Sequence, residues 1–252
     1  DQTGQAKVGF PAGQGGLIHR FFQGYLVPAF TGGVVTTYTL SAPAWQWLAD
    51  IWPYVHPQSV GFEFMQEPLL SGEVWVAWDH VARLKNALEQ RPDDFVAVPA
   101  PAGPEGLAFM PVIAGLAIPE TAPNQDGARE LIHFLTETST QAATLREVGF
   151  FPVVSGDLPG DLSAGIAAEA EAVTAQAGAP NALPSLLPIG LGERGGDFNK
   201  VYLDAFQRII LGGEDIQTVL TEEAQDLESI MQETQAPCWA PDPASDGPCP
   251  VG

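Results

Sequence analysis

The chain has 252 residues, enough for one large domain or two small ones. It carries 31 acidic and 10 basic side chains, for a formal net charge of −21, which argues against nucleic acid and anionic membranes as partners because both bind clustered Lys and Arg. Apolar residues make up 45% of the chain, so we expect a buried core. No apolar run approaches the ~18 residues of a membrane span.

The first predicted elements are helices. An apolar run from Leu17 to Gln23 predicts a helix that ends before Pro28. A second helix is predicted after Ser41, which is a good N-cap residue, because apolar residues recur at helical spacing between positions 44 and 52.

Strands and helices alternate in the next part. The segments 72–78 and 95–99 predict buried strands because they are apolar, rich in β-branched and aromatic residues and bounded by Gly or Pro. Asp79 is predicted to cap the helix between them, and a third apolar segment runs from Met110 to Ile118. This alternation predicts an α/β fold.

The remainder is predicted to be mostly helical. Apolar periodicity and capping residues place helices over about 126–138, 139–148, 162–176, 197–210 and 215–232. Gly149 is predicted to end the second of these. Asp197 is predicted to cap the fourth, and Gly212 with Gly213 to end it.

The two cysteines, Cys238 and Cys249, lie in a proline-rich tail. The residues between them cannot form a helix and favour a disulfide-closed loop, over two free thiols or a weak metal pair. A disulfide implies an extracytoplasmic location. The sequence begins at Asp1 without an initiator Met, so we expect a processed product or part of a longer chain.

The sequence carries no enzyme or metal signature. Its four histidines form no H-x-x-x-H or H-x-H pair, and no Cys or carboxylate cluster has metal-ligand spacing, so no metal or other cofactor is expected. The G-x-S-x-G nucleophile motif is absent. One G-x-G-x-x-G occurs at 190–195, where Pro184 and Pro188 interrupt the strand that a dinucleotide site requires, so a turn-rich loop is favoured.

Aromatic and polar residues meet at the end of the first predicted strand. Strand alternation sends Trp75 and Trp78 to opposite faces. One is expected in the core, whereas the other either joins it there or lines a cleft together with Asp79 and His80. Aromatic faces with a few hydrogen-bonding groups suit sugar rings.

Four short stretches follow one another in a recognisable order between residue 69 and about residue 232. They are LLSGEVWVAWD at 69–79, VPAPAGPEG at 98–106, a run over 115–153 that contains GLAIP and GFFPV, and GGED at 212–215. Together they resemble the extracellular solute-binding proteins of ABC importers, in the maltose-binding-protein-like class. Each stretch is weak alone, and their order makes the resemblance specific.

The resemblance implies an α/β, periplasmic-binding-protein-like (type II) architecture of two lobes, here incomplete at the N-terminus. It assigns 1–98 and 152–235 to lobe two and 99–151 to a returning segment of lobe one. Residues 236–252 form the proline-rich tail that the Cys238–Cys249 disulfide is expected to close. Because the returning segment would lack its sheet partners, we expect a fragment, or a chain that pairs with a separate N-terminal lobe.

The resemblance also implies a function without catalysis. The chain is expected in the periplasm or outside the cell, secreted or lipid-anchored before processing, where it captures a carbohydrate or polyol between the lobes and delivers it to a membrane permease. The family's ligand positions fall on Trp78, Asp79, His80, Phe109, Met110, Asn199, His19 and Gln23. Trp78 or Phe109 is expected to stack on a ring, and Asp79 and His80 to bind hydroxyl groups. A secreted glycan hydrolase and a structural surface protein remain the alternatives.

Overall fold

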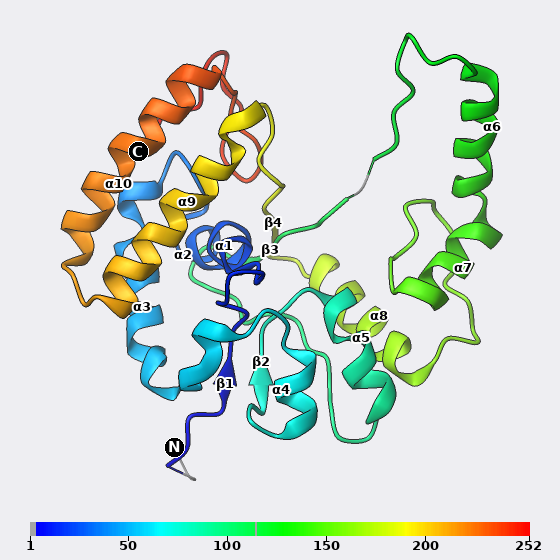
Figure 1. Ribbon diagram of the computed structural model, residues 1–252, viewed down its shortest axis with the longest axis horizontal. Coiled ribbons are helices and arrows are strands. Elements are labelled where there is room, and N and C mark those ends of the chain that lie inside the picture. Colours follow the sequence, from blue (N-terminus) through cyan, green and yellow to red (C-terminus); the bar gives the residue numbers. More distant parts are fainter. Residues whose placement is uncertain (1–3, 114) are drawn as a thin grey trace. The chain divides into compact units, whose positions relative to one another are not determined.

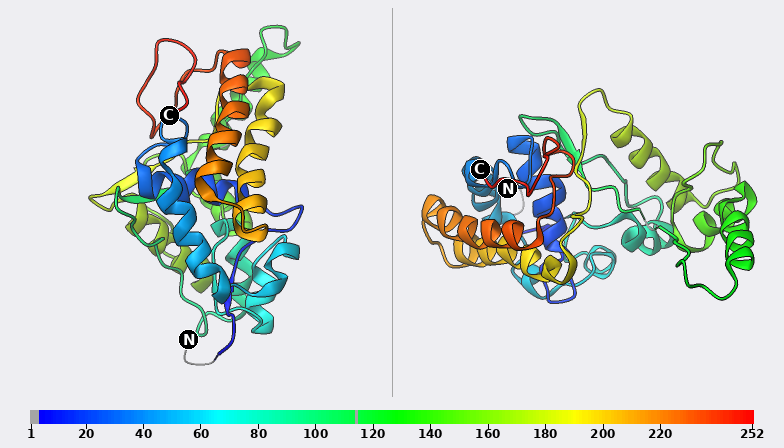
Figure 2. Two further views of the ribbon diagram at one scale, coloured as in Figure 1. Left: turned by 90° about the vertical axis from the view of Figure 1, so that its left-hand side faces the viewer. Right: turned by 90° about the horizontal axis from the view of Figure 1, so that it is seen from above.

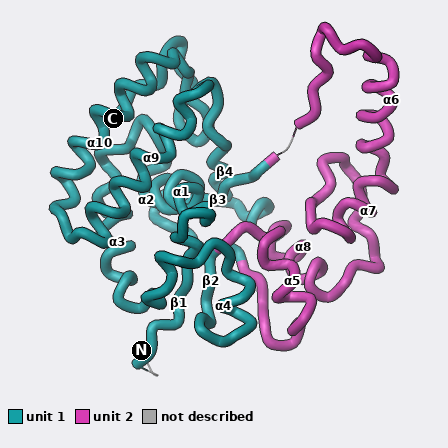
Figure 3. Tube along the Cα trace, viewed as in Figure 1, with its two compact units in different colours: residues 1–78, 99–112, 175–252 teal, residues 79–98, 113–174 magenta. Residues whose placement is uncertain are grey.

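The computed structural model describes residues 4–113 and 115–252. The chain divides into two compact units, which Figure 3 shows in different colours. Unit 1 comprises residues 1–78, 99–112 and 175–252, and unit 2 comprises 79–98 and 113–174. Helices predominate and the strands are short, so the chain is of mixed α/β class, as predicted. The assignment of residues to two lobes stays a prediction.

Unit 1 contains two parallel strand pairs. β1 (Val8–Gly9) pairs with β2 (Val76–Ala77), and β3 (Leu107–Phe109) pairs with β4 (Ala182–Pro184). Its α-helices are α1 (Ile18–Phe21), α2 (Val27–Thr31), α3 (Ala42–Ile51), α4 (Gln66–Ser71), α9 (Gly195–Phe206) and α10 (Ile216–Thr234). Its short 3-10 or π-helical turns are η1 (Phe22–Leu26), η2 (Tyr38–Leu40), η3 (Trp52–Tyr54), η4 (Pro57–Gly61), η5 (Gly192–Arg194) and η6 (Gln207–Leu211).

The first helix of unit 1 is longer than predicted. α1, η1 and α2 follow one another without a break, so the helix passes Pro28 instead of ending before it. Pro28 has no amide N–H to donate to the carbonyl of Gly24. The helix continues through this position as a wider π-helical turn. In this turn the Val27 N–H donates to the carbonyl oxygen of Phe22, five residues back.

The core of unit 1 is aromatic. The Phe22 ring is fully buried and lies 5.1 Å from the ring of Trp45 and 5.4 Å from that of Phe206. These contacts join η1, α3 and α9. α10 packs alongside α9, as the views in Figure 1 and Figure 2 both show. The predicted helix after Ser41 is confirmed, although the Ser41 hydroxyl donates to the Tyr38 carbonyl and does not cap α3.

A disulfide closes the C-terminal tail on itself, and polar contacts hold the tail to the rest of unit 1. The predicted disulfide between Cys238 and Cys249 is present. Asp242 is buried, and its carboxylate accepts hydrogen bonds from three successive backbone N–H groups, those of Val34, Val35 and Thr36. The tail therefore fixes the loop that precedes η2.

Unit 2 is helical where it has regular structure in its described residues. Its helices are α5 (Val81–Gln90), α6 (Gln125–Thr136), α7 (Thr138–Val148) and α8 (Ala164–Ala177), the last of which runs into unit 1 at its end. The predicted helices over 126–138, 139–148 and 162–176 are thus confirmed. Gly149 ends α7 as predicted, with the φ of +72° that favours glycine.

Two predicted buried strands are wrong in large part. Residues 95–99 form no strand, and the side chains of Val96 and Val98 are 79% and 69% exposed. In segment 72–78 only Val76 and Ala77 belong to a strand, and Trp75 is 58% exposed. An apolar, β-prone run becomes a strand only where a neighbouring strand pairs with it. Segment 95–99 finds no such neighbour among the described residues.

Two predicted caps are also corrected. The N-cap of α5 is His80, one residue after Asp79, and the Asp79 carboxylate accepts the His80 backbone N–H at 2.8 Å instead. α9 begins at Gly195, so Asp197 lies inside its first turn and pairs with Arg194 at 2.7 Å. In both places the helix starts at a different residue from the expected one. At the start of α10 the Asp215 carboxylate accepts the Thr218 N–H.

Candidate functional site

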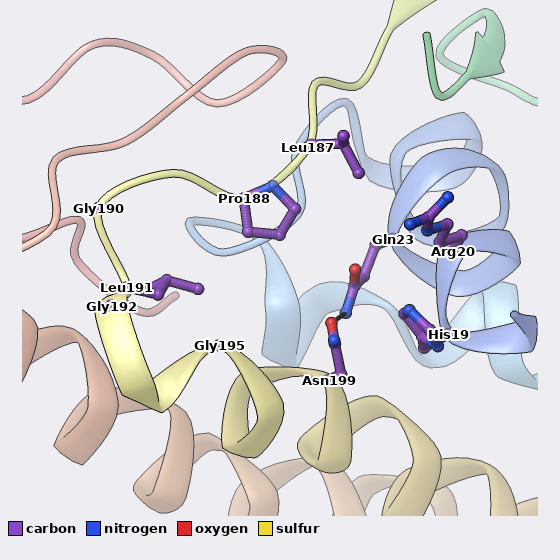
Figure 4. A pocket seen from close by; sticks show the side chains of 10 residues that line it. All are labelled: His19, Arg20, Gln23, Leu187, Pro188, Gly190, Leu191, Gly192, Gly195 and Asn199. Atoms are coloured by element: carbon purple, nitrogen blue, oxygen red, sulfur yellow. Dashed lines mark hydrogen bonds between the residues drawn. The ribbon is translucent and has the colours of Figure 1, made fainter. Parts of the chain in front are cut away.

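A pocket of about 320 Å³ opens in unit 1 between helical and loop segments. This volume is at the small end of the ~300–1,000 Å³ typical of small-molecule sites. Three segments line it: the α1–η1 helix, the loop after β4, and the first turns of α9 (Figure 4). The lining residues are His19, Arg20, Gln23, Leu187, Pro188, Gly190, Leu191, Gly192, Gly195 and Asn199.

Helical spacing explains which side chains reach the pocket. His19 and Gln23 are four residues apart on the α1–η1 helix, and Gly195 and Asn199 are four apart on α9. Residues at this spacing share one face of a helix. Each helix therefore presents one face to the same cavity, although the two faces are about 176 positions apart in the sequence.

The two helices meet through a pair of amides. The Gln23 side chain is 1% exposed, and its Nε2 donates to Asn199 Oδ1 at 3.0 Å. Figure 4 shows the two side chains pointing toward one another. Amide oxygen and nitrogen assignments follow from the hydrogen-bond network, and exchanging both pairs of atoms would keep the bond.

A buried serine supports this amide pair. The hydroxyl of Ser185, which follows β4 directly, donates to the backbone carbonyl of Gln23 at 2.7 Å. The Ser185 backbone N–H donates to the carbonyl of Phe109 at 2.8 Å. Ser185 thus links the β3–β4 pair to the helix that carries Gln23, and it is fully buried.

The pocket histidine is uncharged at neutral pH. Burial, together with the positive charge of neighbouring Arg20, lowers the pKa of His19 to about 4. A neutral imidazole offers one N–H donor and one nitrogen acceptor. His19 can therefore both donate to and accept from a ligand.

The glycine-rich loop forms the third wall. Gly190 and Gly192 have φ values of +77° and +51°, which side-chain-bearing residues rarely adopt. A Cβ on Gly190 would also lie 3.2 Å from the Cβ of Ala236. The expectation of a turn-rich loop at 190–195 fits this geometry, but the sequence reasoning missed that the loop lines a pocket. The sequence signal for such a wall was the run of glycines between 190 and 195, directly before a predicted helix.

The structure brings three of the eight predicted site residues together in this pocket, namely His19, Gln23 and Asn199. Phe109 supports Gln23 through Ser185, and Met110 lies so close to Gly24 that a Cβ there would be 2.5 Å from the Met110 Cβ. Neither lines the pocket. The roles of all these residues stay predictions.

The other predicted residues lie elsewhere. The Trp78 ring packs edge-on against the Phe21 ring in unit 1, at 5.1 Å between centroids. Asp79 and His80 belong to unit 2, where the Asp79 carboxylate lies 3.9 Å from the Arg83 guanidinium. In the described residues, no group of three or more His, Cys, Asp or Glu is placed to hold a metal ion.

The α1–η1 wall of the pocket lies in a part of the chain that matches a known family. The model of that family, described as bacterial extracellular solute-binding protein, matches residues 4–142, more than half of the sequence. The chain belongs to this family. Among curated proteins, none matches it.

Membership of the solute-binding protein family indicates the general role of the chain. Proteins of this family are non-enzymatic and bind solutes for ABC transporters, so a small-molecule ligand and a transporter permease are the implied partners. The family is extracellular, which suggests the periplasm or the outside of the cell. Within residues 4–113 and 115–252, no helix is both long and apolar enough to span a membrane.

Proposed function

We propose that this solute-binding protein captures a small carbohydrate or polyol in the unit 1 pocket and delivers it to a membrane permease. The observation that carries the proposal is the pairing of Gln23 with Asn199 beside the uncharged His19. These three side chains supply hydrogen-bond donors and acceptors without net charge. Hydroxyl groups, which both donate and accept, are the ligand groups that such a set suits.

The remaining walls support a ligand with apolar C–H surface. Leu187, Pro188 and Leu191 line the side formed by the loop after β4 (Figure 4). Small-molecule sites combine apolar walls with a few fixed polar groups, and in this pocket these three residues supply the apolar share. The volume of about 320 Å³ favours a small sugar or polyol over a long oligosaccharide.

The hydrolase alternative lacks support at this pocket. Glycoside hydrolysis commonly uses two carboxylates that flank the scissile bond. None of the residues that line the pocket is Asp or Glu. The proposal of a receptor therefore needs no chemistry beyond binding.

Titration calorimetry against a panel of sugars and polyols tests the proposal. We expect saturable binding without consumption of the titrant, weakened about tenfold or more by Asn199→Ala because a paired amide is lost. The matched control is Asn86→Ala, at an exposed position of α5 in unit 2, which should leave the affinity unchanged. Absence of binding across the panel, or continuous heat from turnover, would contradict the proposal.

Delivery to a permease is tested in cells. If the protein serves an importer, a strain lacking it should lose uptake of the solute found by calorimetry, and the Asn86→Ala variant should restore uptake. An Asn199→Ala variant should restore it only at raised solute concentration. Normal uptake in the deletion strain would contradict the transport role.

We further propose that the 113–153 segment of unit 2 packs against a companion α/β lobe, as the two-lobe resemblance implies. Several apolar side chains of this segment are half exposed or more: Ile113, Leu116, Leu131, Phe134, Phe150 and Val153. Monomeric soluble proteins rarely expose so many large apolar side chains along one segment. Changing Leu131 and Phe134 to Ser should improve solubility without weakening ligand binding, and a loss of solubility would contradict the idea.

A further inference from the structure

We infer that the disulfide-closed tail, residues 236–252, positions the wall that the loop after β4 contributes to the pocket. Ligand binding then depends on whether Cys238 and Cys249 are joined. This inference rests on the proposed function and deepens it, because it names what controls the same pocket. It follows from three contacts that the tail makes with residues that form or support the pocket.

The first contact is a backbone hydrogen bond at the start of the loop. The Leu186 N–H donates to the carbonyl oxygen of Ala240 in the tail at 2.9 Å. The residue before it, Ser185, is bonded to β3, and the residue after it, Leu187, lines the pocket (Figure 4). The tail therefore fixes the backbone at the point where the chain enters the wall.

The second contact lies at the other end of the same loop. Gly190 lines the pocket and packs directly on the tail. A Cβ at this position would lie 3.2 Å from the Cβ of Ala236 and 3.8 Å from the Cδ of Pro237. The loop is thus in contact with the tail on both sides of the wall residues Leu187 and Pro188.

The third contact supports the helix that carries the amide of the pocket. The Trp239 ring of the tail is buried and packs edge-on against the Phe198 ring, with 5.5 Å between the ring centroids. Phe198 is fully buried on α9 and directly precedes Asn199. The tail therefore contacts two of the three segments that line the pocket.

Long-range contacts hold the tail itself in place. Residues 236–252 form no helix or strand, so no local hydrogen-bond pattern orders them. The disulfide joins Cys238 to Cys249, whose backbone N–H donates to the carbonyl of Ala236 at 2.8 Å. Within the closed loop, the Asp242 carboxylate binds the backbone N–H groups of residues 34–36. These contacts fix the part of the tail that touches the pocket.

A wall that is already ordered binds a ligand more tightly than one that the ligand must order, because ordering costs conformational entropy. Without the disulfide, the tail residues beside Cys238 lose one of the constraints that hold them against the loop. The side chains of Leu187 and Pro188 then gain freedom that binding has to remove. We therefore expect weaker binding by a protein that is still folded.

Hydrogen exchange tests the positioning without a ligand. In the Cys238→Ser, Cys249→Ser double variant, we expect the Leu186 amide to exchange about tenfold faster or more than in the wild type. The amides of α3 should stay strongly protected, which shows that unit 1 is folded. A wild-type exchange rate at Leu186 in the folded double variant overturns the inference.

A second variant keeps the disulfide intact. Asp242→Asn removes one acceptor oxygen from the anchor of the tail, so we expect the Leu186 amide to exchange about threefold faster or more. The matched control is Asp246→Asn, the same change at an exposed position of the same loop, which should leave the exchange rate unchanged. If the double variant does not fold, equal rates in these two variants overturn the inference.

Calorimetry at pH 7 with glucose, sorbitol and glycerol connects the wall to binding. We expect the affinity for any of these that binds to fall about tenfold in the folded double variant and to stay unchanged in Asp246→Asn. A tail with a merely structural role would leave the affinity of the folded variant unchanged, and that result overturns the inference. No binding by the wild type contradicts the proposed function, whereas the exchange rates decide separately whether the tail positions the wall.

Discussion

Unit 1 and unit 2 differ in how they bury their apolar side chains. Unit 1 packs most of its aromatic residues into one continuous core, closes its tail with a disulfide and holds that tail in place through a buried aspartate. Unit 2 buries a few aliphatic side chains, including Leu88, Leu145 and Ile166, and exposes Leu131 and Phe134. It also buries a carboxylate, that of Glu169, with no hydrogen-bond partner among the described residues.

This difference in apolar burial indicates which unit has the larger free energy of unfolding. Burial of apolar surface is the main favourable contribution to folding, and an unpartnered buried carboxylate opposes it. We therefore expect unit 1, which carries the pocket, to be the more stable unit. The two can be followed separately, because all six tryptophans lie in unit 1.

The largest expected effect is on the unit 1 core. Phe22→Ala removes a fully buried ring between Trp45 and Phe206 and should lower the free energy of unfolding by about 3–5 kcal/mol. The same change at Phe134, which is 54% exposed, should cost no more than about 0.5 kcal/mol. Urea unfolding monitored by tryptophan fluorescence and circular dichroism compares the two. Equal effects would remove the distinction between the units.

Opening the disulfide should have the next largest effect. Changing both Cys238 and Cys249 to Ser frees a loop closed over 11 positions, and should destabilise unit 1 by about 3 kcal/mol in the chain-entropy treatment. Unit 2 contains no cysteine, so its transition should not move. Calorimetric scans with and without reductant provide the measurement, and a shift confined to unit 2 would contradict the assignment of the tail to unit 1.

Glu169 should make the stability of unit 2 depend on pH. Burial and the nearby Glu89 carboxylate, opposed by Lys85, raise the pKa of this carboxyl to about 7. Between pH 4.5 and 7 the folded state keeps a proton that the unfolded state has released, so stability falls as pH rises through this range, by about 3 kcal/mol. Glu169→Gln should flatten this dependence and stabilise unit 2 at pH 8. A wild-type profile that rises with pH over the same range would show the sign to be wrong.

The smallest expected effect is that of pH on ligand affinity at the pocket of unit 1. Because the pKa of His19 is lowered to about 4, its imidazole stays uncharged from pH 8 to 5.5, and ligand affinity should be flat over that range. Affinity should fall only as the pH approaches 4. Calorimetry at several pH values measures this, with His19→Gln as a variant that cannot titrate. A loss of affinity centred near pH 6.5 would indicate a histidine with an ordinary pKa.

Local features of the sequence predicted most helices correctly. Apolar periodicity located α3, α6, α7, α8 and α10 to within a few residues, because an amphipathic helix carries its hydrogen bonds within one segment. Gly149 as the end of α7 follows from local backbone preferences in the same way. Strands were predicted less well, since segment 95–99 needs a pairing partner from elsewhere in the chain.

The sequence by itself determined the helices, the disulfide and the family of this chain, because each depends on neighbours along the chain or on a motif order. Only the tertiary structure decided the pocket. It placed Gln23 against Asn199, turned the loop at 190–192 into a wall and lowered the pKa of His19 by burying it. Long-range packing creates the cavity and the burial of His19, because both depend on segments far apart in the sequence.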